Sequence, residues 1–228
     1  MDEIEEKSFV AGAVETIKTI IYALLIAGVF RTLFFQPFWI PSGSMKDTLL
    51  IGDFLFVNKM AYGYSYASCP KIQIPRFGVN IDADDFCGFL KDRDTRILGG
   101  EPKRGDVVVF RHPVTGSDYI KRLIGLPGDK IQMQAGLLQI NGTAVEIEPT
   151  ANFVETYEPQ GSQRNRPICA NGAVGLSADC IKKKYIETLP NGASHGILDT
   201  FDQDAMQLGG RMNVDSTKVY SVPEGHFF

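Results

Sequence analysis

A serine that follows glycine in a proline-initiated turn is the first candidate nucleophile in this chain. The turn runs through Pro41, Ser42, Gly43 and Ser44. A serine hydroxyl is a poor nucleophile until a base removes its proton, and the charge that then develops on the substrate needs two hydrogen-bond donors. The Ser42 hydroxyl and the Ser44 backbone N–H are candidates for these donors. Because Ser-Gly-Ser occurs in many surface loops, this stretch alone does not identify an enzyme.

The base for such a serine must come from elsewhere, and Lys121 is the strongest candidate. It lies in an apolar segment, Tyr119 to Leu126, that is expected to form a strand with Lys121 on the face opposite Ile120 and Arg122. Apolar surroundings lower the pKa of a lysine from about 10.4 by several units, which makes the neutral amine available. The alternative is an exposed strand lysine with a solvated tip.

The histidines and cysteines of the chain indicate neither a histidine base nor a metal site. His112, His195 and His226 stand in no convincing partner motif, and we expect each to be a surface or packing residue. None of the cysteines forms the close C-x-x-C pair of a zinc or redox site. In an oxidising compartment the closest pairing is Cys169 with Cys180, and the alternative is that all the cysteines are buried free thiols.

Residues 17–35 are expected to form a membrane anchor. The stretch is apolar except for Lys18 and Arg31, which lie near its ends, where long side chains can reach the headgroups. A span of about 20 residues is the length that a bilayer requires. A cleaved signal peptide would need a basic start and a small-x-small cleavage site, which we do not find. The other alternative, a buried amphipathic helix, disagrees with the nearly unbroken apolar run.

The rest of the chain predicts a mainly β domain, because short apolar segments alternate with glycine and proline turns. The strongest hairpin pattern covers 137–148, with its turn at Asn141-Gly142. The net charge of −4 and the lack of basic clusters argue against nucleic-acid binding. The longest basic run, 182–184, is typical of a solvated face.

The chain is expected to have five parts. They are an N-terminus (1–16), the anchor (17–35), a β core (36–148) with a variable excursion at 60–100, an inserted region that decorates the core (149–215), and the start of a return to the core (216–228).

Three segments together resemble the bacterial type I signal peptidases, or leader peptidases, a family of serine–lysine peptidases. In the order of the family, and just after a membrane span, they are Pro41-Ser-Gly-Ser-Met-x-x-Thr-Leu49 with Gly52-Asp53, Arg104-Gly-Asp-Val-Val-Val-Phe110, and Tyr119-Ile-Lys-Arg-x-x-Gly-Leu-Pro-Gly-Asp129. Each motif alone is weak, but the set is specific. The resemblance implies a coiled β-sheet catalytic domain after one N-terminal transmembrane helix.

Residue by residue, the resemblance places the nucleophile on Ser44, the general base on Lys121 and the side-chain oxyanion donor on Ser42. It implies no cofactor. The family also has a shallow apolar pocket for small substrate side chains. The residues that match its lining are Ile40, Met45, Leu49, Tyr119 and Ile120.

The family removes signal peptides from exported preproteins at the outer surface of the inner membrane. The resemblance therefore implies a single-pass protein of the inner (cytoplasmic) membrane, with its N-terminus inside and its catalytic domain in the periplasm. Its expected partners are preprotein signal peptides, the lipid bilayer and the protein export machinery, without nucleic acid.

Two features depart from the family pattern. Asp47 stands where the family often has proline, a change that we expect to be tolerated. After Phe228 the family continues into a Gly-Asp-x-Arg-x-x-Ser-x-Asp-Ser-Arg-like segment whose serine helps to orient the lysine, so we expect the chain as it stands to be impaired. Two alternatives follow: a non-catalytic or truncated membrane-tethered β module of the protein export system, and a repressor-type self-cleaving Ser–Lys protease, against which the anchor argues.

Overall fold

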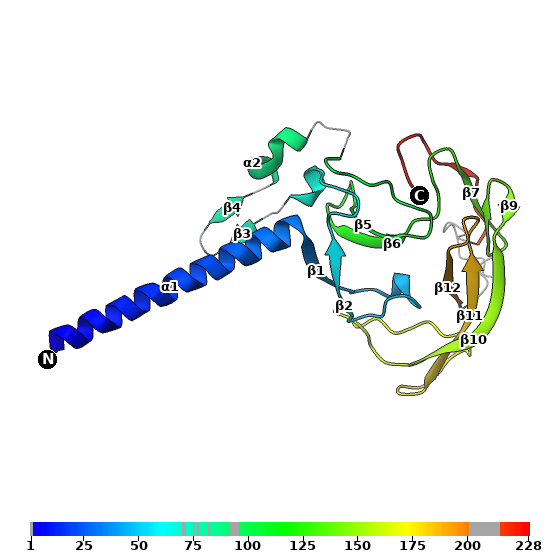
Figure 1. The fold of residues 1–228 in the computed structure, drawn as a ribbon. Coiled ribbons are helices and arrows are strands. Elements are labelled where there is room, and N and C mark those ends of the chain that lie inside the picture. The colour runs from blue at the N-terminus through cyan, green and yellow to red at the C-terminus, as the bar shows by residue number, and fades with distance from the viewer. Residues whose placement is uncertain are drawn as a thin grey trace. The chain divides into compact units, whose positions relative to one another are not determined.

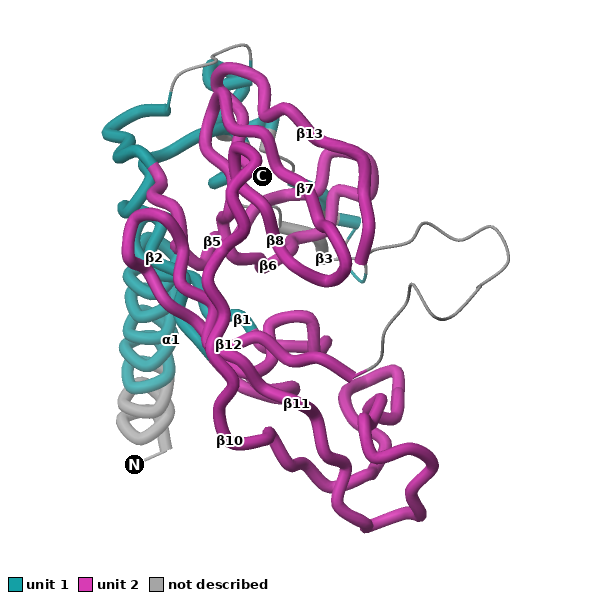
Figure 2. The backbone as a smooth tube through the Cα atoms, turned by 90° about the vertical axis from the view of Figure 1, so that its right-hand side faces the viewer, with its two compact units in different colours: residues 1–38, 55–101 teal, residues 39–54, 102–228 magenta. Residues whose placement is uncertain are grey.

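The structure is a computed structural model that describes residues 2–69, 72–74, 76, 78–81, 83–91, 96–200 and 215–228. It is mainly β with one long N-terminal helix (Figure 1), which agrees with the expected fold class. The chain divides into two compact units (Figure 2). Residues 1–38 and 55–101 form the first unit, and residues 39–54 and 102–228 form the second.

The first unit is dominated by helix α1. It also contains short elements and most of a two-stranded sheet of β1 and β2. The elements are α1 (Asp2–Leu33), β1 (Phe35–Trp39), β2 (Phe54–Asn58), η2 (Tyr66–Ser68), β3 (Ile72–Ile74), β4 (Val79–Ile81), α2 (Ala83–Cys87) and η4 (Gly88–Leu90). A disulfide between Cys69 and Cys87, with an S–S distance of 2.01 Å, joins the segment after η2 to the end of α2.

Helix α1 is long and apolar enough to cross a membrane. Its apolar part, Ala11–Leu33, has 23 residues with a mean hydropathy of 1.8, and none of it is buried. The helix ends two residues before the end of the expected anchor, since Phe35 already belongs to β1. Pro37 accounts for this end, because proline lacks an N–H and disfavours helical backbone at the residue before it.

The second unit is built from three antiparallel sheets. Their strand orders are β5-β6, β13-β7-β8-β9 and β10-β11-β12. The elements are η1 (Gly43–Met45), β5 (Val107–Arg111), β6 (Asp118–Arg122), β7 (Lys130–Gln134), β8 (Leu137–Ile140), β9 (Thr143–Ala144), β10 (Glu146–Thr156), β11 (Asp179–Thr188), β12 (Ser194–Asp199) and β13 (Tyr220–Ser221).

The core of the second unit lies around β7 and β8. The apolar side chains of these strands alternate inward, as a half-buried sheet requires. The buried residues are Ile131, Leu138, Ile140, Val145, Leu189 and Val222. The expected hairpin is present, because β8 turns at Asn141-Gly142 into β9, but β9 is short and the chain then leaves for β10.

The region 149–215 contributes more than the decoration that was expected of it. It supplies most of β10 and all of β11 and β12, which form one long curved sheet (Figure 1). Leu189, which is only 1% exposed, belongs to the core cluster. The sequence did not indicate β10 clearly, because most of its residues are exposed and its apolar residues do not alternate regularly.

A disulfide and a short C-terminal strand hold two further segments against the sheets of the second unit. Cys169 is bonded to Cys180 on β11, with an S–S distance of 1.97 Å, and Cys180 is fully buried. Strand β13 pairs with β7, with Tyr220 opposite Ile131, so the region 216–228 lies against the core.

Candidate active site

Ser44 lies in η1, a single 3-10 turn that two backbone hydrogen bonds stabilise. The N–H of Lys46 donates to the carbonyl of Gly43 at 3.1 Å, and that of Leu49 donates to the carbonyl of Met45 at 2.9 Å. The Met45 side chain is buried, with 7% exposed, and anchors the turn in the second unit. The neighbouring Ser44 side chain remains exposed, as a nucleophile must.

Backbone hydrogen bonds between the residues that precede and follow the serine loop hold its two ends together. The Ile40 N–H donates to the Asp53 carbonyl at 2.9 Å, and the Gly52 N–H donates to the Ile40 carbonyl at 2.8 Å. Gly52 has φ +97°, a conformation that glycine adopts without strain. The Asp53 carboxylate accepts the N–H of Leu50 at 2.8 Å. These contacts explain why a Gly-Asp pair follows the serine turn.

Lys121 reaches Ser44 from β6. Antiparallel pairing with β5 places Lys121 opposite Val108, and its Nζ lies 2.5 Å from the Ser44 Oγ. Burial lowers the pKa of Lys121 below its ordinary value, because desolvation disfavours the ammonium form. In the neutral form the same geometry allows the amine to accept the hydroxyl proton. The structure therefore brings together the two residues that the sequence separates by 77 positions.

Ser44 and Lys121 both line a cleft of about 1060 Å³ within the second unit. Its wall also includes residues of β11 and β12, such as Tyr185 and Ile197. The cleft is as large as the upper end of typical ligand pockets, which is enough for a short extended peptide. Of the five residues expected to form an apolar pocket, Met45 lines this cleft.

The other four expected pocket residues have different surroundings. Ile40 is 2% exposed and belongs to the base of the serine loop. The ring of Tyr119 stacks on Phe110, with 6.2 Å between their centroids. Leu49 and Ile120 are half-buried outside the lining of the cleft. A peptide pocket formed by these residues stays a prediction.

Ser42 immediately precedes the 3-10 turn as its N-cap residue. Its backbone is extended, with φ −136° and ψ 154°, and its side chain does not cap the turn. Its hydroxyl is thus not used to satisfy the backbone donors of η1. The role of Ser42 as an oxyanion donor stays a prediction.

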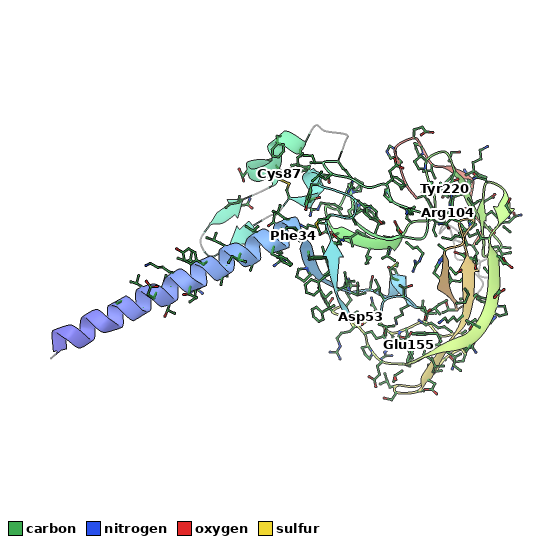
Figure 3. The ribbon with its side chains drawn as sticks, in the orientation of Figure 1. Phe34, Asp53, Cys87, Arg104, Glu155 and Tyr220 are labelled. Atoms are coloured by element: carbon green, nitrogen blue, oxygen red, sulfur yellow. A yellow bond between two sulfur atoms is a disulfide. The ribbon has the colours of Figure 1, made fainter. Side chains whose placement is uncertain are left out.

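A buried charged cluster lies beside the serine turn and was missed from the sequence. Lys46 Nζ lies 2.5 Å from Glu155 Oε2 and 2.7 Å from Gln160 Oε1. Lys182 Nζ lies 2.7 Å from Glu155 Oε1. Burial raises the pKa of the Glu155 carboxyl, but hydrogen bonds from Lys182, Lys46 and Gln160 outweigh it, so the pKa is below the ordinary value. Glu155 lies on β10, where it is labelled in Figure 3.

The next two residues of the loop also have charged partners. Lys184 Nζ lies 2.8 Å from Asp47 Oδ2. Arg122 donates to the Thr48 hydroxyl at 2.8 Å and to the Gly105 carbonyl at 2.7 Å. The run 182–184 was expected to be solvated, but Lys182 and Lys184 form ion pairs with Glu155 and Asp47. Strand alternation, which puts residues 182 and 184 on one face, is the signal that could have found them.

Two of the sequence motifs are joined by a second buried ion pair. Arg104 Nη2 lies 2.7 Å from Asp129 Oδ2, and their side chains are only 9% and 10% exposed. Asp129 also accepts the Leu126 N–H at 2.7 Å and the Asn141 amide at 2.8 Å. Burial raises the pKa of Asp129, but these hydrogen bonds and the Arg104 charge lower it by more than burial raises it. The pKa of Asp129 therefore lies below its ordinary value. This pair closes the loop that follows β6.

The three histidines have partners other than the serine. His195 is buried, with its Nε2 3.2 Å from Glu187 Oε2, and the ring nitrogen of His112 accepts backbone N–H groups. The ring of His226 lies 3.0 Å from the carbonyl of Glu224. Within the part of the chain that the structure describes, no cluster of His, Cys, Asp or Glu could hold a metal ion.

Comparison with known proteins identifies the family. The family model described as signal peptidase, peptidase S26, matches residues 13–228. The signal peptidase I of Rickettsia canadensis is 34% identical over 215 residues, which are 92% of this chain and 66% of that protein. Those of Rickettsia typhi and Rickettsia prowazekii are each 36% identical over 212 residues, 91% of this chain and 64% of theirs. This chain thus spans about two thirds of the length of these relatives.

The region that the family model matches includes the residues of the candidate site. The matched region contains the serine turn, β6 with Lys121 and the motif pair of Arg104 and Asp129. A match that covers nearly the whole chain is consistent with the mainly β fold and the apolar N-terminal helix. The chain belongs to the signal peptidase family, peptidase S26.

Proposed function

We propose that this protein is a membrane-bound serine endopeptidase that cleaves N-terminal signal peptides from exported preproteins. The observation that carries the proposal is the 2.5 Å distance between Lys121 Nζ and Ser44 Oγ. Its relatives of similar sequence are named signal peptidase I, and burial lowers the pKa of Lys121, which favours the neutral amine that a base requires.

The reaction would use this pair twice. Neutral Lys121 takes the hydroxyl proton as Ser44 Oγ attacks the scissile carbonyl, and the resulting oxyanion is bound by the Ser44 N–H and the Ser42 hydroxyl. The lysine ammonium then protonates the leaving amine, and the signal peptide stays bound as an ester on Ser44. A water molecule that loses its proton to the same amine hydrolyses this ester and restores the serine.

The membrane anchor fits this substrate. A signal peptide has an apolar segment that lies in the bilayer, and Ala11–Leu33 of this chain is long enough to lie there too. Holding enzyme and substrate in one membrane raises their effective concentration. We propose a single span in the inner membrane, with the N-terminus in the cytoplasm and the catalytic unit in the periplasm near the export machinery.

Processing of a preprotein tests the proposed function. The detergent-solubilised protein is incubated with a preprotein that has small residues before its cleavage site, and the product is sequenced from its N-terminus. We expect one cut, directly after the small residues. If the protein produces no such cut, the proposed function is wrong.

The pH dependence of cleavage tests the role of Lys121. Protonated Lys121 cannot act as a base, so the rate is expected to rise with pH as the amine loses its proton. Because burial lowers the pKa of Lys121, the rise should occur below pH of about 10.4, the ordinary value. The measurement is kcat/KM from pH 6 to pH 10, and a flat profile over this range contradicts a lysine base.

A further inference from the structure

We infer that strands β10 and β11 hold the Ser44 turn in its reactive position through the charged side chains that follow the nucleophile. This inference rests on the proposed role of Ser44. It assigns a function to the inserted region, whose Glu155 and Lys184 are positioning residues and not catalytic ones.

The loop after Ser44 is held at three consecutive positions. Lys46 pairs with Glu155 of β10 at 2.5 Å, and Asp47 pairs with Lys184 of β11 at 2.8 Å. Thr48 accepts a hydrogen bond from Arg122 on β6, next to Lys121, at 2.8 Å. The loop therefore contacts both β6, the strand that carries Lys121, and the sheet of β10 and β11.

The contact between Lys46 and Glu155 is buried, and Lys182 shares it. The side chains of Lys46, Glu155 and Lys182 are 7%, 11% and 10% exposed. Glu155 receives one lysine on each oxygen, and Gln160 donates to the same carboxylate at 2.8 Å. Two buried ammonium groups are tolerated only while this carboxylate lies between them, because an unpaired buried charge is costly. The position of Lys46, two residues after Ser44, is thereby specified.

The contact between Asp47 and Lys184 involves β12 as well as β11, because Gly196 of β12 lies beside the Asp47 carboxylate. A Cβ atom at Gly196 would lie 2.2 Å from Asp47 Oδ2, so glycine at this position leaves room for the carboxylate. Ser44 itself has an exposed side chain and lies in a turn of only three residues. A turn this short has few internal bonds of its own, so contacts from outside decide where its hydroxyl points.

Glu155, Asp47 and Lys184 do not themselves line the cleft, which includes Ser44 and Lys121. The side chains that contact Glu155, namely Lys46, Lys182 and Gln160, do line it. Replacing Glu155 or Lys184 should therefore change the orientation of the nucleophile and leave substrate binding nearly intact. Misplacement of a reacting group by about 1 Å costs about 100-fold in rate, and this sets the expected size of the effect.

Steady-state cleavage of a preprotein by point variants tests the inference. We expect Glu155→Gln to lower kcat by about 100-fold and Lys184→Gln by about 10-fold, with KM changed by less than about 3-fold. Lys184→Arg keeps the pair with Asp47 and should restore most of the rate. The matched control is Glu148→Gln, an exposed carboxylate on the same strand as Glu155, which should keep the unmutated rate.

Hydrogen exchange gives a measurement that does not depend on cleavage. In Glu155→Gln and Lys184→Gln, the amides of Lys46 and Leu49 should exchange at least about 10-fold faster, while those of β7 and β8 keep their protection. If the unmutated protein cleaves no preprotein, the proposed function fails, and this exchange pattern still tests the loop contacts.

Three outcomes would overturn the inference. The first is an unchanged kcat and unchanged loop exchange in Glu155→Gln and Lys184→Gln. The second is a loss of protection throughout the second unit in Lys184→Gln, the milder variant, which would show that the contacts only stabilise the fold. A KM increase without a kcat decrease also contradicts a positioning role, since it would assign these residues to substrate binding.

Discussion

Replacing Ser44 by alanine is expected to lower the rate of signal-peptide cleavage by at least about 10⁴-fold. Without the hydroxyl no acyl-enzyme can form, and only binding and oxyanion stabilisation remain. Lys121→Met, which keeps the length and apolar stem of the lysine, should cause a loss of similar size. Its amine, 2.5 Å from the Ser44 Oγ, is the nearest base to the nucleophile that the structure places in the cleft.

The double variant distinguishes a catalytic pair from two separate defects. Because Ser44 and Lys121 act in one step, removing both should cost about as much as removing either. Lys130→Met serves as the matched control, since Lys130 is an exposed strand lysine on β7 and should leave the rate unchanged. The measurement is single-turnover cleavage of a preprotein. A loss below about 10-fold in either single variant would contradict the proposed pair.

Replacing Asp129 by alanine is expected to lower the free energy of unfolding by about 3–5 kcal/mol, because it leaves the Arg104 guanidinium buried without its partner. The two side chains are 10% and 9% exposed. The substitution also removes the acceptor of the Leu126 N–H and of the Asn141 amide. Urea denaturation of the protein in detergent micelles measures the loss.

A partly exposed ion pair provides the control for this substitution. Arg111 and Asp118 are 26% and 29% exposed, with Nε 3.1 Å from Oδ1. Asp118→Ala should therefore cost less than about 1 kcal/mol. Equal losses in the two variants would show that the buried pair has no special role in stability.

The contribution of Asp129 should also depend on pH. Its pKa in the folded protein is below the value of about 3.9 for an unfolded chain, because hydrogen bonds and Arg104 stabilise the carboxylate. The contribution is then fully present above pH of about 3.9 and is lost as the pH falls toward the folded pKa. The difference in stability between the unmutated protein and Asp129→Ala should accordingly shrink in acid, while it stays constant from pH 5 to pH 8.

Local patterns allowed much of the fold to be predicted. The apolar segment from Tyr119 to Leu126 indicated β6, which ends at Arg122, and the Asn141-Gly142 pair indicated the hairpin of β8 and β9. The apolar length of the N-terminal segment indicated a helix that can span a membrane. The pairing of β10 with β11 could not be predicted, because residues 157–178 separate the two strands in the sequence.

The candidate site was predictable in its residue types but not in its surroundings. Ser44 and Lys121 were found through motifs, and the structure places them 2.5 Å apart. The pairs of Lys46 with Glu155 and of Asp47 with Lys184 had no motif to mark them. Charged residues far apart in the chain have no periodic relation, so only the folded sheet decides which of them meet.

Ser44 and Lys121 thus mark what the sequence by itself determined and what it left open. The apolar anchor and the β character follow from local chemistry and periodicity, which need no knowledge of distant contacts. The proposal of Ser44 as nucleophile and Lys121 as base follows from three motifs that resemble those of the signal peptidase family. Tertiary structure alone decided that Lys121 is buried enough to lower its pKa. It also decided that Glu155 lies between two lysines beside the serine turn. Burial and charge pairing are properties of the packed chain, because desolvation depends on every neighbour that excludes water.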